Sequence, residues 1–461
     1  MKRLIPVLAL TALLVGAYST VRAASNWYVA PSGLDTNSCQ SVAAPCKTIG
    51  AAIGKAASGG TINVAVGTYQ EKVSISGKNL ALIGAGTETT IVDGGIALLA
   101  TAQVANMTVR NGNTIEGGVY VDSAVTANLS NMKISGNARG ILNLGKLKVT
   151  NTTISQNDGN FPYGGGLWNF RTGEATLTNV TLSNNKASFG GGAIQNAGIL
   201  TLSNAIISSN VVSETTSSPD SGEGGGINNA GTLYLSDSLV TGNSAADGGG
   251  GITNSGQATL HRLTISNNSA QIGGGIDNLY LGSTTVLTLT NTTISGNTGT
   301  DFGGGIANGL AEATLTNVTI SNNTSAQGSA ISAGSSTVRL LNTILVSSTP
   351  AKNCQLDSPL ISLGHNLENG SSCGLSASGD LKNTDPLLGP LQQNGGFSPT
   401  QVLGPGSPAI DHGTNTGYPA LDQRGVIRPI DGDKNGSAIC DIGAYELNPF
   451  TKAVYLPRAQ K

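Results

Sequence analysis

The stretch Gly250-Gly251-Ile252-Thr253-Asn254 returns 24 residues later as Gly274-Gly275-Ile276-Asp277-Asn278. Related copies of this phrase follow one another along the chain at intervals of 26, 27, 33, 25, 24 and 30 residues. A period of this size is typical of a repeat architecture, in which each copy is one supersecondary unit buried by its neighbours. Seven Gly- or Ala-led copies of the phrase occur, and they end at Asn143, Asn169, Asn196, Asn229, Asn254, Asn278 and Asn308.

Two further phrases run in phase with the first. One is a β-branched run ending in Asn, such as T-I-S-N-N to Asn268, and the other alternates apolar residues with Ser or Thr, as in Val286 to Asn291. No window carries helical spacing over three turns, so each unit is expected to form three short strands. Equivalent strands of successive coils would then stack about 4.8 Å apart as parallel sheets. The sequence predicts an all-β, three-sheet parallel β-helix with inward Ile and Leu, outward Ser and Thr, and stacked turn asparagines.

Composition excludes several classes of protein. The net charge is −2 and the basic residues are scattered, so nothing favours a nucleic-acid partner. Gly accounts for 65 of the 461 residues, yet the period-two aliphatic pattern argues against disorder. Residues 1–23 have the charged, apolar and small-residue regions of a secretory signal peptide, and no later stretch is apolar enough for a membrane helix. A secreted or cell-surface location is expected.

Export makes disulfides permissible, and the five cysteines are spaced accordingly. Cys39 and Cys46 flank one polar loop, and Cys354 and Cys373 flank another. We predict these two local pairs and a free Cys440; the alternative is five free thiols.

Residues 24–95 are expected to form the N-terminal cap and first coils. The segments Trp27 to Gly33, Pro45 to Ile49, Gly59 to Tyr69 and Leu82 to Gly86 resemble the opening of pectin-lyase-like proteins, which implies a right-handed β-helix. Ile49, Ala52, Ile53 and Ala56 share one helical face that is expected to close the solenoid. The repeats, over residues 96–346, resemble those of bacterial polymorphic outer-membrane proteins, without their C-terminal barrel.

The composition changes over residues 347–461: eleven of the sixteen prolines lie from Pro350 to Pro457. The segments Asp385 to Leu391, Gly406 to Asp411, Asp422 to Gly425 and Cys440 to Glu446 resemble the choice-of-anchor Q domain. The resemblance implies a C-terminal module of bacterial surface β-helices. The usual apolar sorting signal does not follow it here.

One edge of the coils carries the candidate binding residues, next to the glycine clusters. Aromatic side chains there are suited to stacking on sugar rings, and two acids one coil apart, Glu223 and Asp247, are suited to sharing a cation or raising a pKa. The alternative is a solvated edge with aromatics packed over glycine. The candidates are Tyr163, Trp168, Phe189, Glu223, Asp247, Asp277, Asp301 and Phe302. Insertions at 214–222 and 279–285 are expected to form loops, often on a binding face.

A second candidate site is the loop Asp431-Gly432-Asp433-Lys434-Asn435-Gly436, which has oxygen ligands at alternate positions as calcium loops do. Ile442 stands where such loops carry Glu, and Asp441 is the expected substitute, so Ca²⁺ is weighed against a plain polar turn.

The sequence favours a non-catalytic, adhesin-like β-helix that binds glycans or other surfaces. The runner-up is a polysaccharide lyase or glycoside hydrolase acting on acidic polysaccharide, which would need convergent acids or an arginine base. No Asp-Asp pair exists, and His261 is expected on an outer turn. A third alternative takes the Thr-x-Thr strands as an ice-like array.

Overall fold

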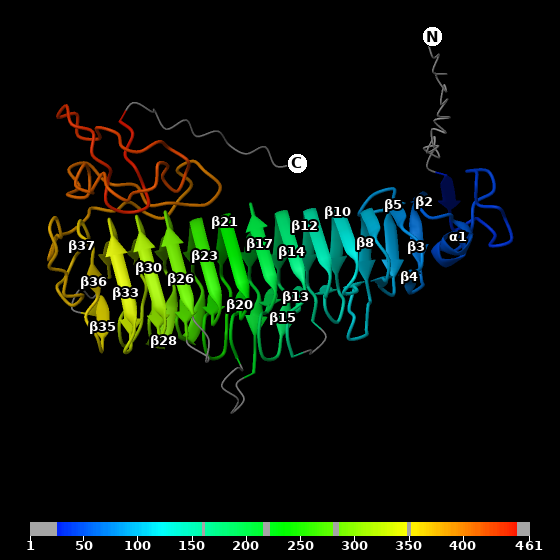
Figure 1. The fold of residues 1–461 in the computed structure, drawn as a ribbon, viewed down its shortest axis with the longest axis horizontal. Coiled ribbons are helices and arrows are strands. Elements are labelled where there is room, and N and C mark those ends of the chain that lie inside the picture. The colour runs from blue at the N-terminus through cyan, green and yellow to red at the C-terminus, as the bar shows by residue number, and fades with distance from the viewer. Residues whose placement is uncertain (1–24, 159–161, 215–221, 280–284, 348–351, 450–461) are drawn as a thin grey trace, which may run out of the picture.

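The computed structural model describes residues 25–158, 162–214, 222–279, 285–347 and 352–449. The predicted signal peptide (1–23), most of the insertion at 214–222, residues 280–284 of the second insertion and residues 450–461 lie outside this part. Within the described residues, no helix is long and apolar enough to span a membrane. The chain winds into an elongated parallel β-helix whose coils follow one another from the N-terminal to the C-terminal end (Figure 1).

A short helix closes the N-terminal end, as predicted. Helix α1 (Ile49–Lys55) begins after Thr48, whose side chain accepts a hydrogen bond from the backbone N–H of Ala51. The carboxylate of Glu71 accepts two more N–H groups of the first turn, at 2.8 and 2.9 Å, so the helix start is well satisfied. The predicted face, Ile49 to Ala56, is buried against the first coil.

One face of the solenoid is a sheet of twelve short strands, which we call the short-strand sheet. Each strand pairs in parallel with its equivalent in the next coil, and all but the terminal strands have two such neighbours. Most strands come directly from the repeated Gly-Ile-x-Asn phrase. They are β4 (Val73–Ile75), β7 (Ile96–Leu98), β9 (Val119–Val121), β11 (Ile141–Asn143), β13 (Leu167–Asn169), β16 (Ile194–Asn196), β20 (Ile227–Asn229), β22 (Ile252–Asn254), β25 (Ile276–Asn278), β29 (Ile306–Asn308), β32 (Ile331–Ala333) and β35 (Cys354–Leu356).

The other two faces form one larger sheet that bends at a corner, which we call the bent sheet. Its first arm precedes the corner and its second arm follows it. The strands are β1 (Asn26–Val29), β2 (Gly60–Val64), β3 (Gly67–Tyr69), β5 (Leu80–Gly84), β6 (Thr90–Asp93), β8 (Ala102–Arg110), β10 (Thr126–Ser135), β12 (Lys146–Ser155), β14 (Glu174–Ser183), β17 (Ile199–Ser203), β18 (Ile206–Ser208), β21 (Thr232–Thr241), β23 (Gln257–Ser266), β26 (Val286–Thr290), β27 (Thr293–Ser295), β30 (Glu312–Thr316), β31 (Thr319–Ser321), β33 (Thr337–Leu341), β34 (Ile344–Val346), β36 (Ile361–Ser362) and β37 (Leu367–Glu368). Two small sheets pair β15 (Lys186–Ala187) with β19 (Val211–Val212) and β24 (Ser269–Ile272) with β28 (Thr298–Phe302).

The corner depends on single residues in the left-handed region. Asn131, Asn151 and Asn179 have φ of 51, 50 and 55° there, a conformation that asparagine tolerates better than most residues. Two coils depart from asparagine: Asp237 and Arg262 occupy the corner and form a salt bridge with 2.6 Å between Arg262 Nε and Asp237 Oδ1. His261 therefore lies next to an outer corner, as the sequence predicted.

Two buried asparagine ladders hold the coils in register. The predicted ladder runs from Asn143 to Asn308, and each side-chain Nδ2 donates to the Oδ1 of the next coil at 2.6–2.8 Å. A second ladder runs from Asn137 to Asn323 at the end of the second arm. In this ladder the backbone N–H of each asparagine also donates to the next Oδ1. The predicted stacking of asparagines is confirmed for the ladder from Asn143 to Asn308.

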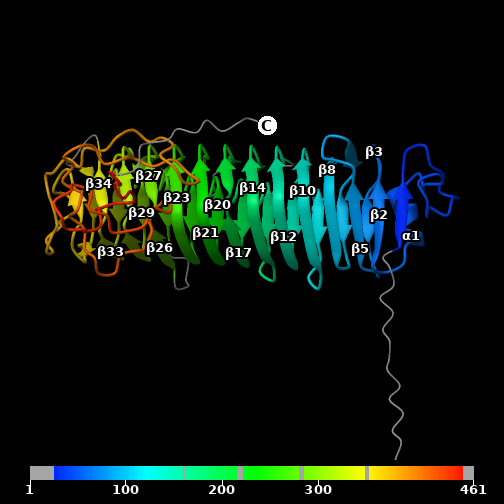
Figure 2. The same ribbon diagram turned by 90° about the horizontal axis from the view of Figure 1, so that it is seen from above.

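The C-terminal segment folds back over the corner and the second arm of the last coils (Figures 1 and 2). Gln423 accepts from Thr293 Oγ1 at 2.6 Å, and Asn317 Nδ2 donates to the carbonyls of Asp441 and Gly443 at 3.2 Å. Outward hydroxyl residues of the repeats, such as Thr264, are therefore buried here. The short-strand sheet lies on the opposite side and stays uncovered by this segment (Figure 1).

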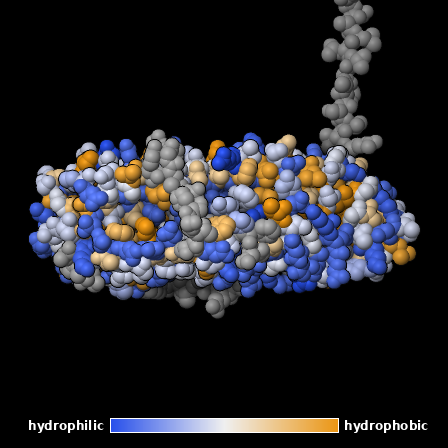
Figure 3. Space-filling model, turned by 90° about the horizontal axis from the view of Figure 1, so that it is seen from below, coloured by the Kyte–Doolittle hydropathy of each residue, from blue (hydrophilic) through white to orange (hydrophobic). Residues whose placement is uncertain are grey.

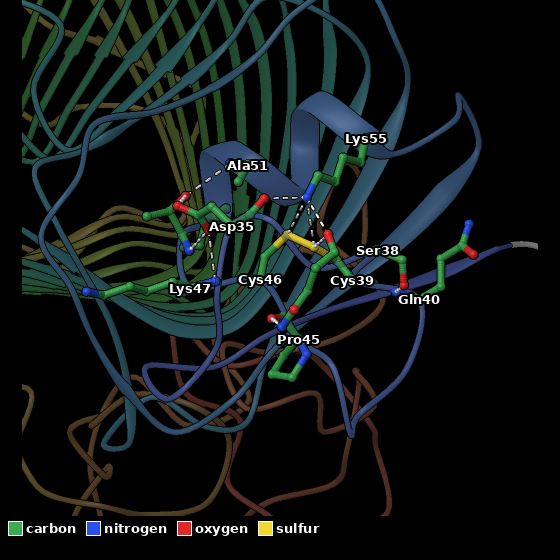
Figure 4. The surroundings of a disulfide bond; sticks show 12 residues. Asp35, Ser38, Cys39, Gln40, Pro45, Cys46, Lys47, Ala51 and Lys55 are labelled. Atoms are coloured by element: carbon green, nitrogen blue, oxygen red, sulfur yellow. Dashed lines mark hydrogen bonds between the residues drawn. A yellow bond between two sulfur atoms is a disulfide. The ribbon is translucent and has the colours of Figure 1, made fainter.

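The cysteines pair as predicted. Disulfides join Cys39 with Cys46 and Cys354 with Cys373, while Cys440 is a free, buried thiol. The first bridge lies beside α1, where Lys55 Nζ donates to the carbonyl oxygen of Asp35 and approaches Cys39 Sγ at 3.6 Å (Figure 4). Two disulfides fit an oxidising, extracellular environment.

We expect the native, unreduced protein to show no reactive thiol. Cys440 is fully buried, and burial raises the pKa of its thiol to about 12, so the reactive thiolate is scarce and shielded. Denaturation without reductant should expose one thiol per chain. Counting thiols with a chromogenic disulfide reagent checks this, and five thiols in the denatured, unreduced chain would contradict both bridges.

Candidate functional site

The short-strand sheet presents one outward side chain per coil. The first and third residues of each strand point inward because side chains alternate along a strand, so the middle residue faces out. Parallel register places these middle residues directly above one another. We call the resulting column the floor row: Trp168, Gln195, Asn228, Thr253, Asp277, Ala307, Ser332 and Gln355. Its seven steps of ~4.8 Å span roughly 34 Å along the solenoid axis.

A second column stands beside the floor row and forms one wall. It contains residues that precede the glycine clusters and pair from coil to coil. We call it the wall row: Tyr163, Gly190, Glu223, Gly248, Ile272, Phe302 and Gln327. Of the candidates predicted for one edge of the coils, Tyr163, Glu223 and Phe302 belong to the wall row, and Trp168 and Asp277 belong to the floor row. They separate into an aromatic group at the N-terminal part and an acidic group further along.

The aromatic group surrounds Trp168. The ring centroids of Tyr163 and Trp168 are 5.9 Å apart, those of Tyr163 and Phe189 are 6.4 Å apart, and Phe170 lies 5.4 Å from Trp168. Phe170 was missed in the sequence, although it directly follows the G-L-W-N phrase. Phe302 does not join this group, because it lies several coils away and pairs with Ile272.

Arg139 lies against the indole ring of Trp168 and was not among the candidates predicted from the sequence. Its guanidinium lies 4.7 Å from the Trp168 ring centroid and donates to the carbonyl oxygens of Ile115 and Tyr163 at 2.8 and 3.2 Å. Arg139 is buried, and this burial lowers its pKa to about 10. A desolvated guanidinium over a ring is a favourable cation–π contact, which fixes the orientation of Trp168.

The polar centre of the floor row has unused hydrogen-bonding capacity. Gln195 is 9% exposed, and its Oε1 has no hydrogen-bond partner among the described residues. A Cβ at Gly190 of the wall row would lie 2.9 Å from both Gln195 Oε1 and Asn228 Nδ2, so glycine leaves room for these amides. A buried amide oxygen without a partner is costly unless a ligand or water supplies a donor.

Three predicted acids lie midway along the floor row and the wall row. Asp247 is one coil beyond Glu223, and its backbone N–H donates to the carbonyl oxygen of Gly222 at 2.9 Å. Asp277 is on the floor row, and burial, assisted by the charge of Asp247, raises its pKa to about 7. Burial also raises the pKa of Asp247. Among the described residues these acids do not form a group of three or more side chains at metal-ligand spacing, and a cation shared by Glu223 and Asp247 alone stays a prediction.

Asp301, the remaining predicted acid, is hydrogen-bonded to neighbouring side chains. Its carboxylate accepts from Gln271 Nε2 at 2.7 Å and from Thr300 Oγ1 at 3.3 Å. It does not line the cavity described next.

A cavity of about 240 Å³, which we call the Asp277 cavity, lies at the C-terminal end of the floor row and the wall row. Figure 3 views this side of the molecule, where a hollow with hydrophilic residues around it lies towards the C-terminal end. The small floor side chains of Ala307 and Ser332 leave the space. The lining consists of Ile272, Asp277, Phe302, Ala307, Asn308, Gly309, Gln327, Ser332, Ala333, Gly334, Gln355 and Asp357.

The predicted calcium loop has a different acid set from the one expected. Asp431 and Asp433 lie together with Asp411, and oxygens of the three are within 4.8 Å of one another. Asn435 instead donates its backbone N–H to Asp431 and Asp433 at 3.1 and 3.0 Å, as in a polar turn. Asp441 does not belong to the cluster.

Asp441 is part of the core of the C-terminal segment. It is fully buried, and its Oδ1 accepts the backbone N–H of Asp411 at 2.8 Å. Burial, with the neighbouring Glu446 carboxylate, raises its pKa to about 8. Glu446 forms a buried ion pair with Arg428, with 2.8 Å between Nη1 and Oε2. These groups stabilise the segment's irregular backbone, and both carboxyl oxygens of Asp441 accept backbone N–H groups within it.

Calcium binding at the loop remains a prediction, now with Asp411, Asp431 and Asp433 as carboxylate ligands. We expect millimolar Ca²⁺ to raise the melting temperature of the full-length protein, since binding to the folded state alone adds about 2.7 kcal/mol at a hundred times the dissociation constant. Asp433→Asn should remove the shift. Scanning calorimetry with Ca²⁺ and with chelator tests this, and identical curves would mean that the loop is only a turn.

Comparisons with known proteins give a likeness of fold. No family model and no curated protein sequence matches the chain. Among solved structures, pectate lyase Pel9A is 14% identical over 92% of this chain and 96% of its own, with a TM-score of 0.38. The A-module of mannuronan C-5 epimerase AlgE4 from Azotobacter vinelandii is 14% identical over 67% of this chain and 82% of its own, with a TM-score of 0.36. The alginate lyase AlyGC is 15% identical over 82% of this chain and 59% of its own, with a TM-score of 0.37. At this level of similarity no role passes to any residue of this chain.

Proposed function

We propose that this protein is exported and binds an extended glycan along the floor row of its short-strand sheet, without chemical turnover. The observation that carries the proposal is the floor row: a supported indole, then amide and hydroxyl side chains, one per coil, on a face that the C-terminal segment leaves open. A polysaccharide chain presents a sugar unit over about the length of one coil step. A linear array of contacts therefore suits a linear ligand.

The aromatic group supplies the stacking surface. Trp168, Tyr163 and Phe170 are partly exposed, and rigid aromatic side chains give large contact areas at low entropic cost. Gln195 contributes a hydrogen-bond acceptor that has no partner among the residues that the structure describes. Apolar ring faces and hydroxyl groups occur together in every sugar unit, and this combination of surfaces matches them.

Attachment to a bacterial cell surface belongs to the same proposal. It is supported by the signal-like residues 1–23, by the two disulfides and by the resemblance of the C-terminal segment to the choice-of-anchor Q domain. That segment covers the corner and second arm of the last coils and leaves the short-strand sheet open along its length (Figure 1).

Affinity electrophoresis in gels containing neutral, acidic and amino polysaccharides tests the proposed function. We expect retardation by at least one polysaccharide, and Trp168→Ala should weaken it about tenfold, corresponding to 1.4 kcal/mol. Tyr234→Ala is the matched control, because Tyr234 is an exposed aromatic residue on the first arm of the bent sheet. Equal loss in both variants, or no retardation at all, would contradict the proposal.

Incubation of the protein with the same polysaccharides in solution separates binding from catalysis. Reducing ends and unsaturated ends should not accumulate if the protein only binds. Turnover that Asp277→Asn or Asp247→Asn abolishes would favour the hydrolase alternative, in which a carboxyl group with a raised pKa serves as general acid.

A further inference from the structure

The Asp277 cavity has an unusual balance of charge for a glycan site. Two carboxylates line it, Asp277 from β25 and Asp357 directly after β35, and its lining contains no lysine, arginine or histidine. Lys352 is close by, but its Nζ is directed to the carbonyl oxygen of Ala326 at 3.5 Å and it does not line the cavity. An acidic polysaccharide would bring further negative charge into this space, which is electrostatically unfavourable.

Asp277 is buried at the cavity without a stabilising partner in the described part of the chain. The side chain is 6% exposed, and among the described residues no hydrogen bond or basic group stabilises its carboxylate. The nearest charged influence is the repulsive carboxylate of Asp247. Gly248 makes the arrangement sterically possible, because a Cβ there would lie 2.6 Å from Asp277 Oδ2. Without a partner such a carboxyl group tends to stay protonated, and a cationic group bound next to it would favour its charged form.

The remaining lining describes the shape of that ligand. Phe302 is 38% exposed and offers a ring face on the wall, whereas Gln327, Ser332 and Gln355 offer amide and hydroxyl groups. The volume of about 240 Å³ corresponds to roughly eight water molecules at ~30 Å³ each, enough for one bulky polar unit. The cavity is also continuous with the floor row, since Asp277, Ala307, Ser332 and Gln355 belong to both.

We propose that the Asp277 cavity binds a positively charged amino-sugar unit of the glycan, with its ammonium group on Asp277 and its ring against Phe302. This inference rests on the proposed function and specifies the ligand: a glycan with free amino groups is preferred over acetylated and acidic ones. Asp357, at the far end of the cavity, attracts the ammonium group of a neighbouring unit.

Isothermal titration calorimetry with three oligosaccharides of equal length provides the test: a glucosamine tetramer, its fully N-acetylated form and a tetragalacturonate, all at pH 6 and one ionic strength. We expect the glucosamine tetramer to bind at least tenfold more tightly than the other two. Asp277→Asn should remove most of this preference, and Asp357→Asn should reduce it severalfold, with little effect on the acetylated tetramer. Glu312→Gln on the first arm is the matched control and should change nothing.

The outcomes distinguish this inference from the function on which it rests. Equal or tighter binding of the acetylated or acidic tetramer would overturn the amino-sugar assignment while leaving glycan binding intact. Tetralysine binding as tightly as the glucosamine tetramer, with the same dependence on Asp277, would also overturn it, because the site would then recognise charge alone. Binding of none of the oligosaccharides would refute both. Because Asp357 is exposed, its variant tests the charge argument without any risk to folding.

Discussion

Replacing Asn243 by alanine should lower the free energy of unfolding by about 4 kcal/mol. Asn243 Oδ1 accepts the backbone N–H and the Nδ2 of Asn210 at 3.0 and 2.9 Å, and its own Nδ2 donates to Asn268 and to the carbonyl of Ile207. Alanine leaves the backbone N–H of Asn210 buried without an acceptor, at a cost of ~1–3 kcal/mol, whereas Asn210 Nδ2 keeps the carbonyl oxygens of Leu182 and Ser208. The three other hydrogen bonds of Asn243 are lost as well, at ~0.5–1.5 kcal/mol each. The midpoint of guanidinium unfolding, followed by circular dichroism, measures the loss.

Asn131→Gly is the control for this prediction. Asn131 is an exposed corner residue that donates one hydrogen bond to Asn106 at 3.1 Å, and its φ of 51° suits glycine without strain. We expect its unfolding midpoint to be close to that of the original protein. If Asn243→Ala were equally mild, the buried ladder would not be what holds the coils in register.

Asp277→Asn should stabilise the protein above pH 7 and destabilise it by ~1–3 kcal/mol at pH 4, where the carboxyl group of the original protein is neutral. Burial raises the pKa of Asp277 from 3.8 to about 7, so the folded state holds this proton more tightly than the unfolded state. Stability therefore falls as the pH rises from about 4 to about 7, by up to about 4 kcal/mol from this group alone. Asparagine removes the titration but leaves a buried amide at a cost of ~1–3 kcal/mol. A net gain of roughly 2 kcal/mol at pH 8 is expected.

Melting temperatures at pH 4 and pH 8 measure this effect. Asp357→Asn, at the exposed end of the same cavity, should show no comparable dependence on pH. The quantity to compare is the melting temperature of Asp277→Asn minus that of the original protein. If this difference were more negative at pH 8 than at pH 4, the carboxylate would have a stabilising partner in the fold. A residue that lowers stability where its charge is present is suited to a ligand that supplies the opposite charge.

The fold followed from the sequence because each coil is specified locally. The Gly-Ile-x-Asn phrase contains the inward apolar residue and the ladder asparagine of one short strand, and the corner asparagines tolerate positive φ. Period and strand pairing together leave few arrangements open. The cap helix was predictable for the same reason, since the spacing from Ile49 to Ala56 is visible within eight residues.

The candidate site was predictable only in part. The edge that carries Tyr163, Glu223 and Asp247 follows from the phase of the repeats. Asp357 was missed because the last two coils replace the phrase with Ile331-Ser332-Ala333 and Cys354-Gln355-Leu356, which carry no ladder asparagine. The floor row therefore extends two coils beyond the point where the sequence pattern ends.

Contacts between distant segments are the other limit. Arg139 supports Trp168 from an earlier coil, and nothing in the local sequence around either residue indicates that they meet. The calcium loop shows the same difficulty: Asp411 is twenty residues before Asp431, whereas the nearer Asp441 is drawn into the core by the N–H of Asp411 and by the Arg428–Glu446 pair. Irregular backbone supplies no period from which such contacts can be inferred.

The fluorescence of Trp168 tests the central claim, glycan binding on the short-strand sheet, most directly. The chain has two tryptophans, and Trp27 is buried in the N-terminal cap, whereas Trp168 is partly exposed on the floor row. Titration with the tightest-binding oligosaccharide should change the emission saturably, with the midpoint of the calorimetric isotherm, and Trp168→Phe should abolish the change. Calorimetric binding with unaltered emission, or an equal change in the Trp168→Phe protein, would place the glycan elsewhere and contradict the account.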